Sequence, residues 1–575
     1  MERPSKRARL SPALSEKATE REESLHTPLT SLQRSISPPA STRSAQLHAS
    51  VSACSDLKND HFDIQDANNA LRSPSQVPSP FQLTHIRDLP DQGGFNDGTL
   101  KLRDILGDPM IKECWQFNYC FDVDFLMSQF DADVRSLVKV KIVHGSWERE
   151  SANKIRIDEA CARFKNVEAI VAYMPERFGT HHSKMMVLLR HDDLAQVIIH
   201  TANMIHGDWT NMTQAVWKSP LLPLLKPGSS SSPQGNTSLG SGARFKRDLL
   251  TYLRAYGPKK TGPLVQQLSQ YDFAAIRAAL VASVPSKQGL IDIDSDIGTL
   301  WGWPALKDLM GRIPLNSRPE ETKSSKPRIV IQISSIASLG QTDKWLKGIF
   351  FKALAPTPSD LAPKYSIIFP TPEEIRNSLD GYGSGGSIHM KTQSAPQQKQ
   401  LQYLRPHLCH WAGESKNIDL SDDKSTRLEA GRGRAAPHIK TYIRFSDEEK
   451  MDSIDWAMVT SANLSTQAWG AAPNPAGEVR ISSFEIGVVV WPELYKPAPI
   501  SPSASEVDQS SDVLMVPCFK QNEPVLTSVA ANAATVVGLR MPYSLPLTPY
   551  SASEEPWCAT APHYLPDWRG MSWLI

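Results

Sequence analysis

The chain has 575 residues, with 62 Lys and Arg against 61 Asp and Glu, and 40% of its residues are hydrophobic. One hydrophobic core seldom grows to this length, so we expect two folded units. A net charge of +1 excludes a wholly cationic nucleic-acid binder but allows a local basic groove.

The seven cysteines are irregularly spaced, without a C-x-x-C pair or a Cys/His cluster at zinc spacing. This pattern predicts neither a disulfide framework nor a bound metal and favours a reducing compartment. No run of about 18 apolar residues occurs, and no apolar segment follows the basic N-terminus. We therefore expect a soluble intracellular protein that does not engage a membrane.

Residues 1–85 are rich in Ser and Pro and poor in aromatic residues, which predicts a disordered tail. The tail opens with a basic patch, Lys6-Arg7-Ala8-Arg9. Such a patch is typical of a nuclear-import signal, and it is equally consistent with a solvated charge run. We expect the protein to act in the nucleus.

Residues 86–315 are predicted to form a first α/β domain. Apolar β-rich runs occupy residues 138–143, 167–173, 185–189 and 197–201, and residues 244–256 have apolar positions at helical spacing. Residues 227–242 have the Ser/Gly composition of a surface loop, and its role stays open.

Residues 316–575 are predicted to form a second α/β domain, beginning after a polar, Pro-containing boundary. Strand-like runs occupy residues 329–334, 438–445, 456–461 and 481–491, with a helix expected over 343–352. A Gly-rich turn is expected at 381–387 and a loop at 415–435, while the role of 500–540 stays open. Strands alternating with helices, twice over, predict two similar domains.

A His-x-Lys motif occurs three times, at His182, His389 and His438. The motif alone is uninformative, and His389 lies in a segment of loop composition. The motifs at 182 and 438 each open an apolar run, and each is answered by a second run that ends in Thr/Ser-Ala-Asn. This matched pattern indicates that the two domains are duplicates that share one site.

Two imidazoles, two ammonium groups and two amides at one point describe a phosphate site. Residues two apart in a strand project to the same face, so each His and its Lys project together. Lysine charge and amide donors suit phosphate oxygens, one His can attack phosphorus, and the other can protonate the leaving oxygen. The residues of this set are His182, Lys184, Asn203, His438, Lys440 and Asn463.

At these residues the chain resembles the phospholipase D superfamily and, within it, the tyrosyl-DNA phosphodiesterase family. Ordinary superfamily members carry an Asp shortly after the Lys, where this chain has Leu189 and Phe445. The resemblance covers most of residues 110–500. It is carried by the two histidine motifs and by the segments 116–122, 178–182, 205–209, 334–340, 385–387 and 437–442.

The resemblance implies two phospholipase D-like α-β-α sandwich domains related by pseudo-twofold symmetry. It implies hydrolysis of the phosphodiester between a DNA 3′ end and a tyrosine of a trapped type I topoisomerase, which leaves a 3′-phosphate. It implies partners that are single- and double-stranded DNA 3′ ends with a tyrosine or peptide adduct. Because the six-residue set contains no carboxylate pair and its two Lys already neutralise a phosphate, we expect no metal or other cofactor, and we expect a monomer. Other 3′ adducts are also conceivable substrates, and the preferred adduct stays open.

By motif position, the resemblance makes His182 the nucleophile that forms a phosphohistidine and His438 the acid and then the base. The pseudo-symmetric sequence itself does not decide which His attacks. Gln214 and Glu485 fall where the family places partners of the two histidines, and a carboxylate near His438 is expected to raise its pKa. The DNA-contacting positions implied by the resemblance are Tyr119, Phe178, Ser335, Ile336, Ala337, Ser338, Ser387 and Ser465.

Two further readings stay open. One is a phospholipase D-type enzyme or nuclease that acts on other diesters, and the other is a DNA-end-binding scaffold without catalysis. Which C-terminal aromatic residues contact DNA also stays open, with Trp557 as a weak candidate.

Overall fold

The computed structural model describes residues 74–90, 92–146, 148, 150–226, 237–290, 295–315, 325–356, 362–413, 427–497, 512–526 and 533–575. All of them belong to one unit, Leu71–Ile575. The basic patch, most of the predicted tail, and most of the 227–242 and 415–435 loops lie outside the described residues. The end of the predicted tail is wrong, because strands begin at Ser75 and Phe81.

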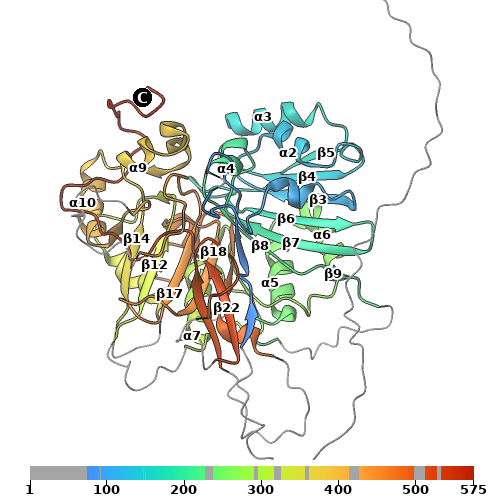
Figure 1. Ribbon diagram of the computed structural model, residues 1–575. Coiled ribbons are helices and arrows are strands. Elements are labelled where there is room, and N and C mark those ends of the chain that lie inside the picture. The colour runs from blue at the N-terminus through green and yellow to red at the C-terminus, as the bar shows by residue number, and fades with distance from the viewer. Residues whose placement is uncertain are drawn as a thin grey trace, which may run out of the picture. The chain divides into compact units, whose positions relative to one another are not determined.

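The first half of the chain builds a mixed sheet with the order β2-β8-β7-β6-β3-β4-β5 (Figure 1). Its strands are β2 (Phe81–Leu83), β3 (Ile111–Phe117), β4 (Lys139–His144), β5 (Val167–Val171), β6 (Met185–Arg190), β7 (Leu194–His200) and β8 (Ala215–Lys218), with β9 (Leu222–Pro223) beside β7. Strands β3, β4 and β5 run parallel, and the other neighbours are antiparallel.

The second sheet has the order β10-β20-β18-β17-β12-β14-β16. Its strands are β10 (Ala279–Ser283), β12 (Arg328–Gln332), β14 (Lys364–Ile368), β16 (Leu408–Cys409), β17 (Thr441–Phe445), β18 (Ile454–Thr460) and β20 (Glu485–Val490). Read in these orders, the two sheets match strand for strand, with the same parallel and antiparallel pairings. The duplication expected from the sequence is therefore a duplication of topology.

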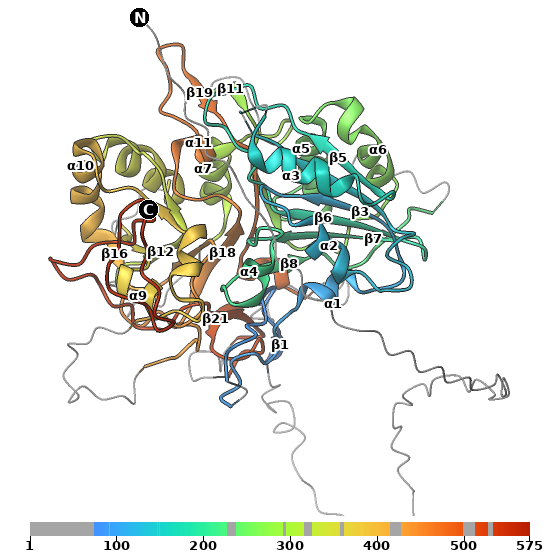
Figure 2. The ribbon, with the colours of Figure 1, turned by 90° about the horizontal axis from the view of Figure 1, so that it is seen from above.

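Helices pack on the faces of both sheets (Figure 2). They are α1 (Leu102–Leu106), α2 (Val123–Gln129), α3 (Ala152–Cys161), α4 (His206–Thr210), α5 (Gly242–Arg254), α6 (Pro258–Ser269), α7 (Gly302–Arg312), α8 (Phe351–Leu354), α9 (Pro372–Arg376), α10 (Ala395–Leu404) and α11 (Thr466–Trp469). A π-helical turn, Leu346–Phe350, precedes α8 where a helix was expected over 343–352, and 3₁₀ turns lie at Gly381–Ser387, Arg405–His407 and Pro492–Tyr495.

Strand β6 explains why its run reads as continuously apolar. Met186 and Leu188 pack toward α1–α3, whereas Met185, Val187 and Leu189 pack into a core shared with α5, α6 and one face of the second sheet. A strand covered on both faces has no solvent side, so its sequence loses the polar alternation. The other face of the second sheet packs on α7, α8 and α10.

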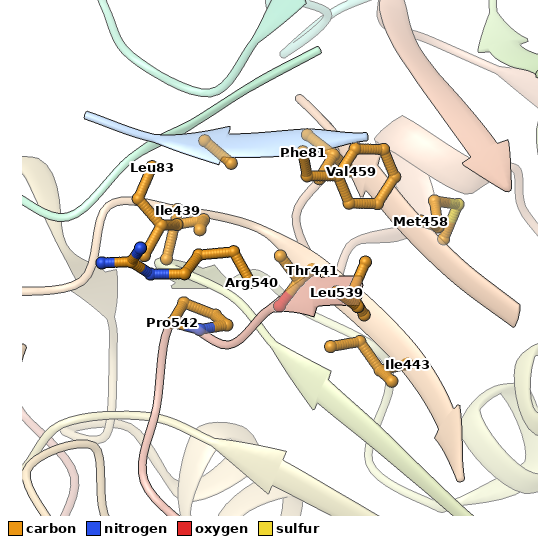
Figure 3. Close-up of a pocket in the computed structure, with 11 residues that line it drawn as sticks. Phe81, Leu83, Ile439, Thr441, Ile443, Met458, Val459, Leu539, Arg540 and Pro542 are labelled. Carbon is orange, nitrogen blue, oxygen red and sulfur yellow. The ribbon is translucent and has the colours of Figure 1, made fainter. Parts of the chain in front are cut away.

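A third, three-stranded parallel sheet pairs a strand near residue 75 with two strands from residues 513–540, and the sequence did not predict it. It consists of β1 (Ser75–Val77), β22 (Thr535–Arg540) and β21 (Val513–Cys518). A small cavity lies where β2, β17 and β22 meet, and Figure 3 shows Ile439 and Thr441 among its lining residues. Because side chains alternate along an extended segment, His438 and Lys440 point away from this cavity.

The chain passes from the first sheet to the second before the domain boundary predicted between residues 315 and 316. Strand β10 already belongs to the second sheet, and β11 (Ser286–Gly289) pairs with β19 (Glu478–Ile481). The short strands β13 (Ser335–Ile336) and β15 (His389–Met390) form a further pair. Within the described residues, no helix has the length and apolar character needed to cross a membrane.

Candidate active site

The two His-x-Lys motifs lie at equivalent places in the two sheets. His182 and Lys184 lead directly into β6, and His438 and Lys440 lead directly into β17. Each Asn follows the neighbouring strand, because Asn203 lies three residues after β7 and Asn463 three residues after β18. The topology therefore delivers all six side chains to matching sheet edges.

Backbone contacts between the halves hold the two motifs against each other. His181 forms an isolated bridge with Phe484, and Pro437 forms the equivalent bridge with Thr213. The His182 amide donates to Phe484 O at 3.0 Å, and the Ile439 amide donates to Thr213 O at 2.9 Å. Each motif is thus held by a backbone segment of the other half, directly before Glu485 in one case and directly before Gln214 in the other.

His182 is paired with a carboxylate from the second half. Its Nδ1 lies 3.0 Å from Glu485 Oε2, and Ser461 Oγ also donates to that oxygen. Burial lowers the pKa of His182, and Glu485 opposes this effect. Burial alone would raise the pKa of the Glu485 carboxyl, but His182 and Lys184 bring it below its ordinary value. The Nδ1 contact leaves Nε2 as the nitrogen available to a substrate.

His438 is paired with residues of the first half. Its Nδ1 lies 3.1 Å from Gln214 Nε2, 3.4 Å from Gln214 Oε1 and 3.1 Å from Asp208 Oδ2. Its Nε2 lies 3.5 Å from Asn203 Nδ2. The sequence analysis did not single out Asp208. The equivalent position of the second repeat, five residues after its Asn, is Ala468, so this difference between the repeats was the available signal.

The predicted direction of the His438 pKa is wrong. A carboxylate does lie beside the ring, but it is Asp208, and Glu485 contacts the other histidine. Burial lowers the pKa of His438 well below its ordinary value, and Lys440 and Lys184 lower it further. Removal from water and two ammonium neighbours together outweigh one acidic partner.

The two lysines are fully enclosed. Lys184 Nζ donates to His182 O at 3.1 Å, and Lys440 Nζ lies 3.3 Å from each ring nitrogen of His438. Burial lowers the pKa of Lys184 to about 8, and burial together with Lys184 lowers that of Lys440 well below its ordinary value. A phosphodiester anion among these groups would offset their mutual repulsion.

The two asparagines are fixed through different atoms. Asn463 Oδ1 accepts from the backbone amides of Ser334 at 3.1 Å and Ser335 at 2.9 Å, so its Nδ2 is turned away as the donor. Asn203 is buried, and its backbone amide donates to Asp208 Oδ2 at 2.7 Å. Both amides can donate to a phosphate oxygen between the motifs.

Two aromatic residues lie on the His182 side. The Tyr119 ring centroid is 5.9 Å from that of His182, in a tilted arrangement. Phe178 is 58% exposed, with φ of 63° and the Arg177 guanidinium 4.9 Å from its ring centroid. A bulky residue with positive φ is strained, and such strain is typical of functional segments.

The other DNA-contact candidates lie near Asn463, and one of them, Ile336, has a buried side chain. Ser335 and Ala337 are partly exposed and Ser338 is exposed, whereas Ile336 is 3% exposed. The Ile336 side chain packs into the core, so the predicted contact of this residue with DNA would come from its backbone. Ser387 Oγ donates to Asp208 Oδ1 at 3.3 Å, and Ser465 Oγ caps α11 by accepting from Ala468 N.

The remaining histidines and Trp557 have other surroundings. His181 is buried, with its ring nitrogens 2.9 Å from Asn118 O and Tyr256 Oη, and His200 packs against Trp209. Trp557 is buried and donates to Gly385 O and Ile388 O, so its candidacy for DNA contact is wrong. Across the described part of the chain, no three His, Cys, Asp or Glu side chains gather as metal ligands.

The sequence match that decides the family spans both motifs. The model of the family described as "Tyrosyl-DNA phosphodiesterase" matches residues 80–551. The chain belongs to the tyrosyl-DNA phosphodiesterase family. It is therefore a phosphodiester hydrolase, as the sequence resemblance implied.

Curated relatives extend over most of the chain. The probable tyrosyl-DNA phosphodiesterase of Schizosaccharomyces pombe is 31% identical over 560 residues, covering 87% of this chain and 97% of that protein. Tyrosyl-DNA phosphodiesterase 1 of Arabidopsis thaliana is 26% identical over 538 residues, covering 89% of this chain and 79% of that protein. Family membership thus extends well beyond the two motifs.

A solved structure shares the fold. The crystal structure of the yeast tyrosyl-DNA phosphodiesterase superposes with a TM-score of 0.56 at 20% identity, covering 84% of this chain and 100% of that chain. The predicted fold class, with two similar phospholipase D-like domains, is confirmed by this likeness and by the matched sheets.

Proposed function

We propose that this protein hydrolyses the 3′-phosphodiester between DNA and a tyrosine of a trapped type I topoisomerase through a phosphohistidine intermediate. The observation that carries the proposal is the crossed arrangement of the site. Glu485 of the second half contacts His182, and Gln214 and Asp208 of the first half contact His438. Each imidazole is oriented from the opposite half, and the charges of His182 and Lys184 act on His438, so both rings can serve one set of lysine and amide groups.

In the first step, His182 Nε2 attacks phosphorus and a nitrogen–phosphorus bond forms. The bond from phosphorus to the tyrosine oxygen breaks, and that oxygen takes the proton of His438 Nε2. In the second step, a water oxygen attacks phosphorus and displaces His182, while His438 Nε2 takes the water proton. The products are free tyrosine or peptide and a DNA 3′-phosphate.

The DNA strand would lie along the Ser335–Ser338 segment, with Phe178 and Tyr119 as stacking surfaces on the other side. Serine hydroxyls and backbone amides position phosphates without reading sequence, and exposed rings stack on any base. This geometry suits DNA 3′ ends of either strandedness. It makes few demands on the adduct beyond an oxygen that can be protonated, so other 3′ adducts are further substrates.

The test is cleavage of an oligonucleotide with a 3′-phosphotyrosine by the purified full chain in buffer with EDTA. We expect a 3′-phosphate product, with activity unchanged by the chelator. A plain diester oligonucleotide and a phosphatidylcholine vesicle serve as comparison substrates. Cleavage of either, with the phosphotyrosine left intact, would point to a nuclease or phospholipase instead. No cleavage of any substrate, with binding of DNA ends, would indicate a scaffold.

We further propose that the protein acts in the nucleus as a monomer, because its substrate class is chromosomal and both motifs lie in one chain. The basic patch Lys6–Arg9 would serve import. Replacing Lys6, Arg7 and Arg9 with Gln in a fluorescent fusion should shift the signal toward the cytoplasm. An unchanged nuclear signal would contradict the role of the patch.

A further inference from the structure

We propose that Asp208 is the positioning residue of His438, holding a proton on Nδ1 so that Nε2 can serve first as acid and then as base. This inference rests on the proposed function and adds to it a residue that the duplicated frame alone does not predict.

The Asp208 carboxylate is enclosed and is held from both halves. It lies on α4, which in both ribbon views sits on the side of the first half nearest α9 of the second (Figures 1 and 2). The residue is 1% exposed, and its Oδ2 is 3.1 Å from His438 Nδ1. Oδ2 also accepts from the Asn203 amide, and Oδ1 accepts from Ser387 Oγ. These contacts fix the carboxylate against the ring.

Gln214 cannot perform the same task equally well. Thr201 Oγ1 donates to Gln214 Oε1 at 2.8 Å, as the Asn203 amide does to Asp208 Oδ2, but the neutral amide oxygen lies farther from His438 Nδ1, at 3.4 Å against 3.1 Å. Gln214 Nε2 is closer, at 3.1 Å, but an amide nitrogen only donates. Lys440 Nζ, 3.3 Å from Nδ1, also only donates, so Asp208 Oδ2 is the nearest acceptor for a proton on Nδ1.

Both chemical steps need that proton on Nδ1. In the first step, His438 gives the proton of Nε2 to the leaving tyrosine oxygen and must remain a neutral ring, which requires hydrogen on Nδ1. In the second step, Nε2 must be an unprotonated acceptor for the water proton, which again requires hydrogen on Nδ1. The other tautomer, favoured by the Gln214 donor, would block the second step.

The repeats show that this carboxylate is an addition to the shared frame. Gln214 and Glu485 occupy equivalent places, immediately before β8 and at the start of β20, so the second half presents a carboxylate where the first presents an amide. Asp208 is matched by Ala468. Each histidine therefore receives one carboxylate, but from non-equivalent positions. The geometry assigns Glu485 to the nucleophile and Asp208 to the acid and base.

The experiment compares Asp208→Asn with wild type on two oligonucleotides, one with a 3′-phosphotyrosine and one with a 3′-p-nitrophenyl phosphate. The nitrophenolate leaves without a proton, so only the first substrate needs acid in the first step. Asp192→Asn is the matched control, because it makes the same carboxylate-to-amide change at an exposed turn where the carboxylate contacts Arg190.

For Asp208→Asn we expect kcat on phosphotyrosine to fall about 100-fold, with KM within about threefold. On the nitrophenyl substrate, we expect the first step to stay within about tenfold of wild type while covalent protein–DNA accumulates. Asp192→Asn should stay within about threefold on both. Equal losses on both substrates with a raised KM, or no loss at all, would overturn the role of Asp208. A wild-type protein inactive on both substrates would instead overturn the proposed function.

A second measurement does not require the Asp208→Asn variant. In the intact ¹⁵N-histidine-labelled protein, the His438 resonances are assigned by their loss in His438→Asn. We expect the ¹⁵N shifts to report hydrogen on Nδ1. Hydrogen on Nε2 of the neutral ring would overturn the proposal.

Discussion

The first and second halves of the chain share a strand order and a motif but differ in what surrounds each histidine. His182 has a single strong partner, Glu485, whereas His438 has an amide, a second carboxylate and a lysine within about 3.5 Å of its ring. Symmetry thus explains how two imidazoles reach one site. The asymmetric partners explain how equivalent residues can carry out different steps, because protonation follows the local environment.

The crossed contacts add a further lesson. Each histidine is oriented by the opposite half, so neither half holds a complete site by itself. A substitution in either half should therefore slow a particular step of the reaction in every molecule, because no half can carry out the reaction alone. The following predictions use that property.

Replacing His182, the nucleophile that we propose, should give the largest effect. We expect His182→Ala to lower kcat by about 10⁴-fold without forming any covalent protein–DNA species, because no other residue occupies its place against Glu485. Quenched-flow assays with a labelled 3′-phosphotyrosine oligonucleotide measure both quantities. His191→Ala, outside the site, is the control. Normal turnover in His182→Ala would remove the distinction between the halves.

Replacing either buried lysine should give the next largest effect. We expect Lys184→Met and Lys440→Met each to lower kcat by about 10²–10³-fold, because each ammonium stabilises charge on the same phosphate. Lys139→Met at the exposed start of β4 should retain full activity. A loss confined to one of the two lysines would show that the halves do not share the phosphate.

Exchanging the partner residues should sharpen the comparison. We expect Glu485→Gln to lower kcat by about 10–10²-fold by slowing formation of the covalent species, since His182 loses its charged partner. The half-buried Glu493→Gln is the control. If the covalent species instead formed at the normal rate and only its hydrolysis slowed, the roles assigned to the two histidines would be reversed.

Acid should destabilise the protein through two buried histidines of the first half. Burial lowers the pKa of His181 and of His200 to about 3, so the unfolded chain binds these protons near pH 6.5 while the folded chain does not. Stability is therefore present above pH 6.5 and lost as the pH falls toward 3. At pH 5 the loss is about 2 kcal/mol for each histidine.

His410 of the second half should respond with the opposite sign. Burial opposes its charge, but Glu374 and Glu554 raise its pKa, so its contribution is present below pH 6.5 and lost as the pH rises through that raised value. Urea unfolding at pH 5 and pH 8 tests both signs. His200→Gln should flatten the acid loss and His410→Gln should not. An acid loss unchanged in His200→Gln would contradict the assignment.

The sequence predicted the parts of the site that depend on local order. His182, Lys184 and Asn203 stand at the ends of apolar runs, and the same holds in the second half, so strand periodicity alone places them together. The partner assignment required the fold. Asp208 was missed because its importance lies in contact with a ring 230 residues away along the chain.

Other parts of the fold escaped prediction for equally physical reasons. Strand β1 lies in a Ser/Pro-rich segment, and only pairing with β22 from the far end of the chain makes it a strand. Ile336 lies in a segment expected to contact DNA, yet its neighbours in the chain are exposed while it packs inward. Ile336 lies in the two-residue strand β13, where successive side chains point to opposite faces. A strand of two residues is too short for the sequence to show which side chain is buried.

The central claim is that one histidine from each half acts in turn on a single phosphate. Its most direct test is to incubate His438→Asn with a 3′-phosphotyrosine oligonucleotide, digest the protein, and map the attached nucleotide by mass spectrometry. We expect an acid-labile adduct on His182. No adduct, or an adduct on another residue, would contradict the account.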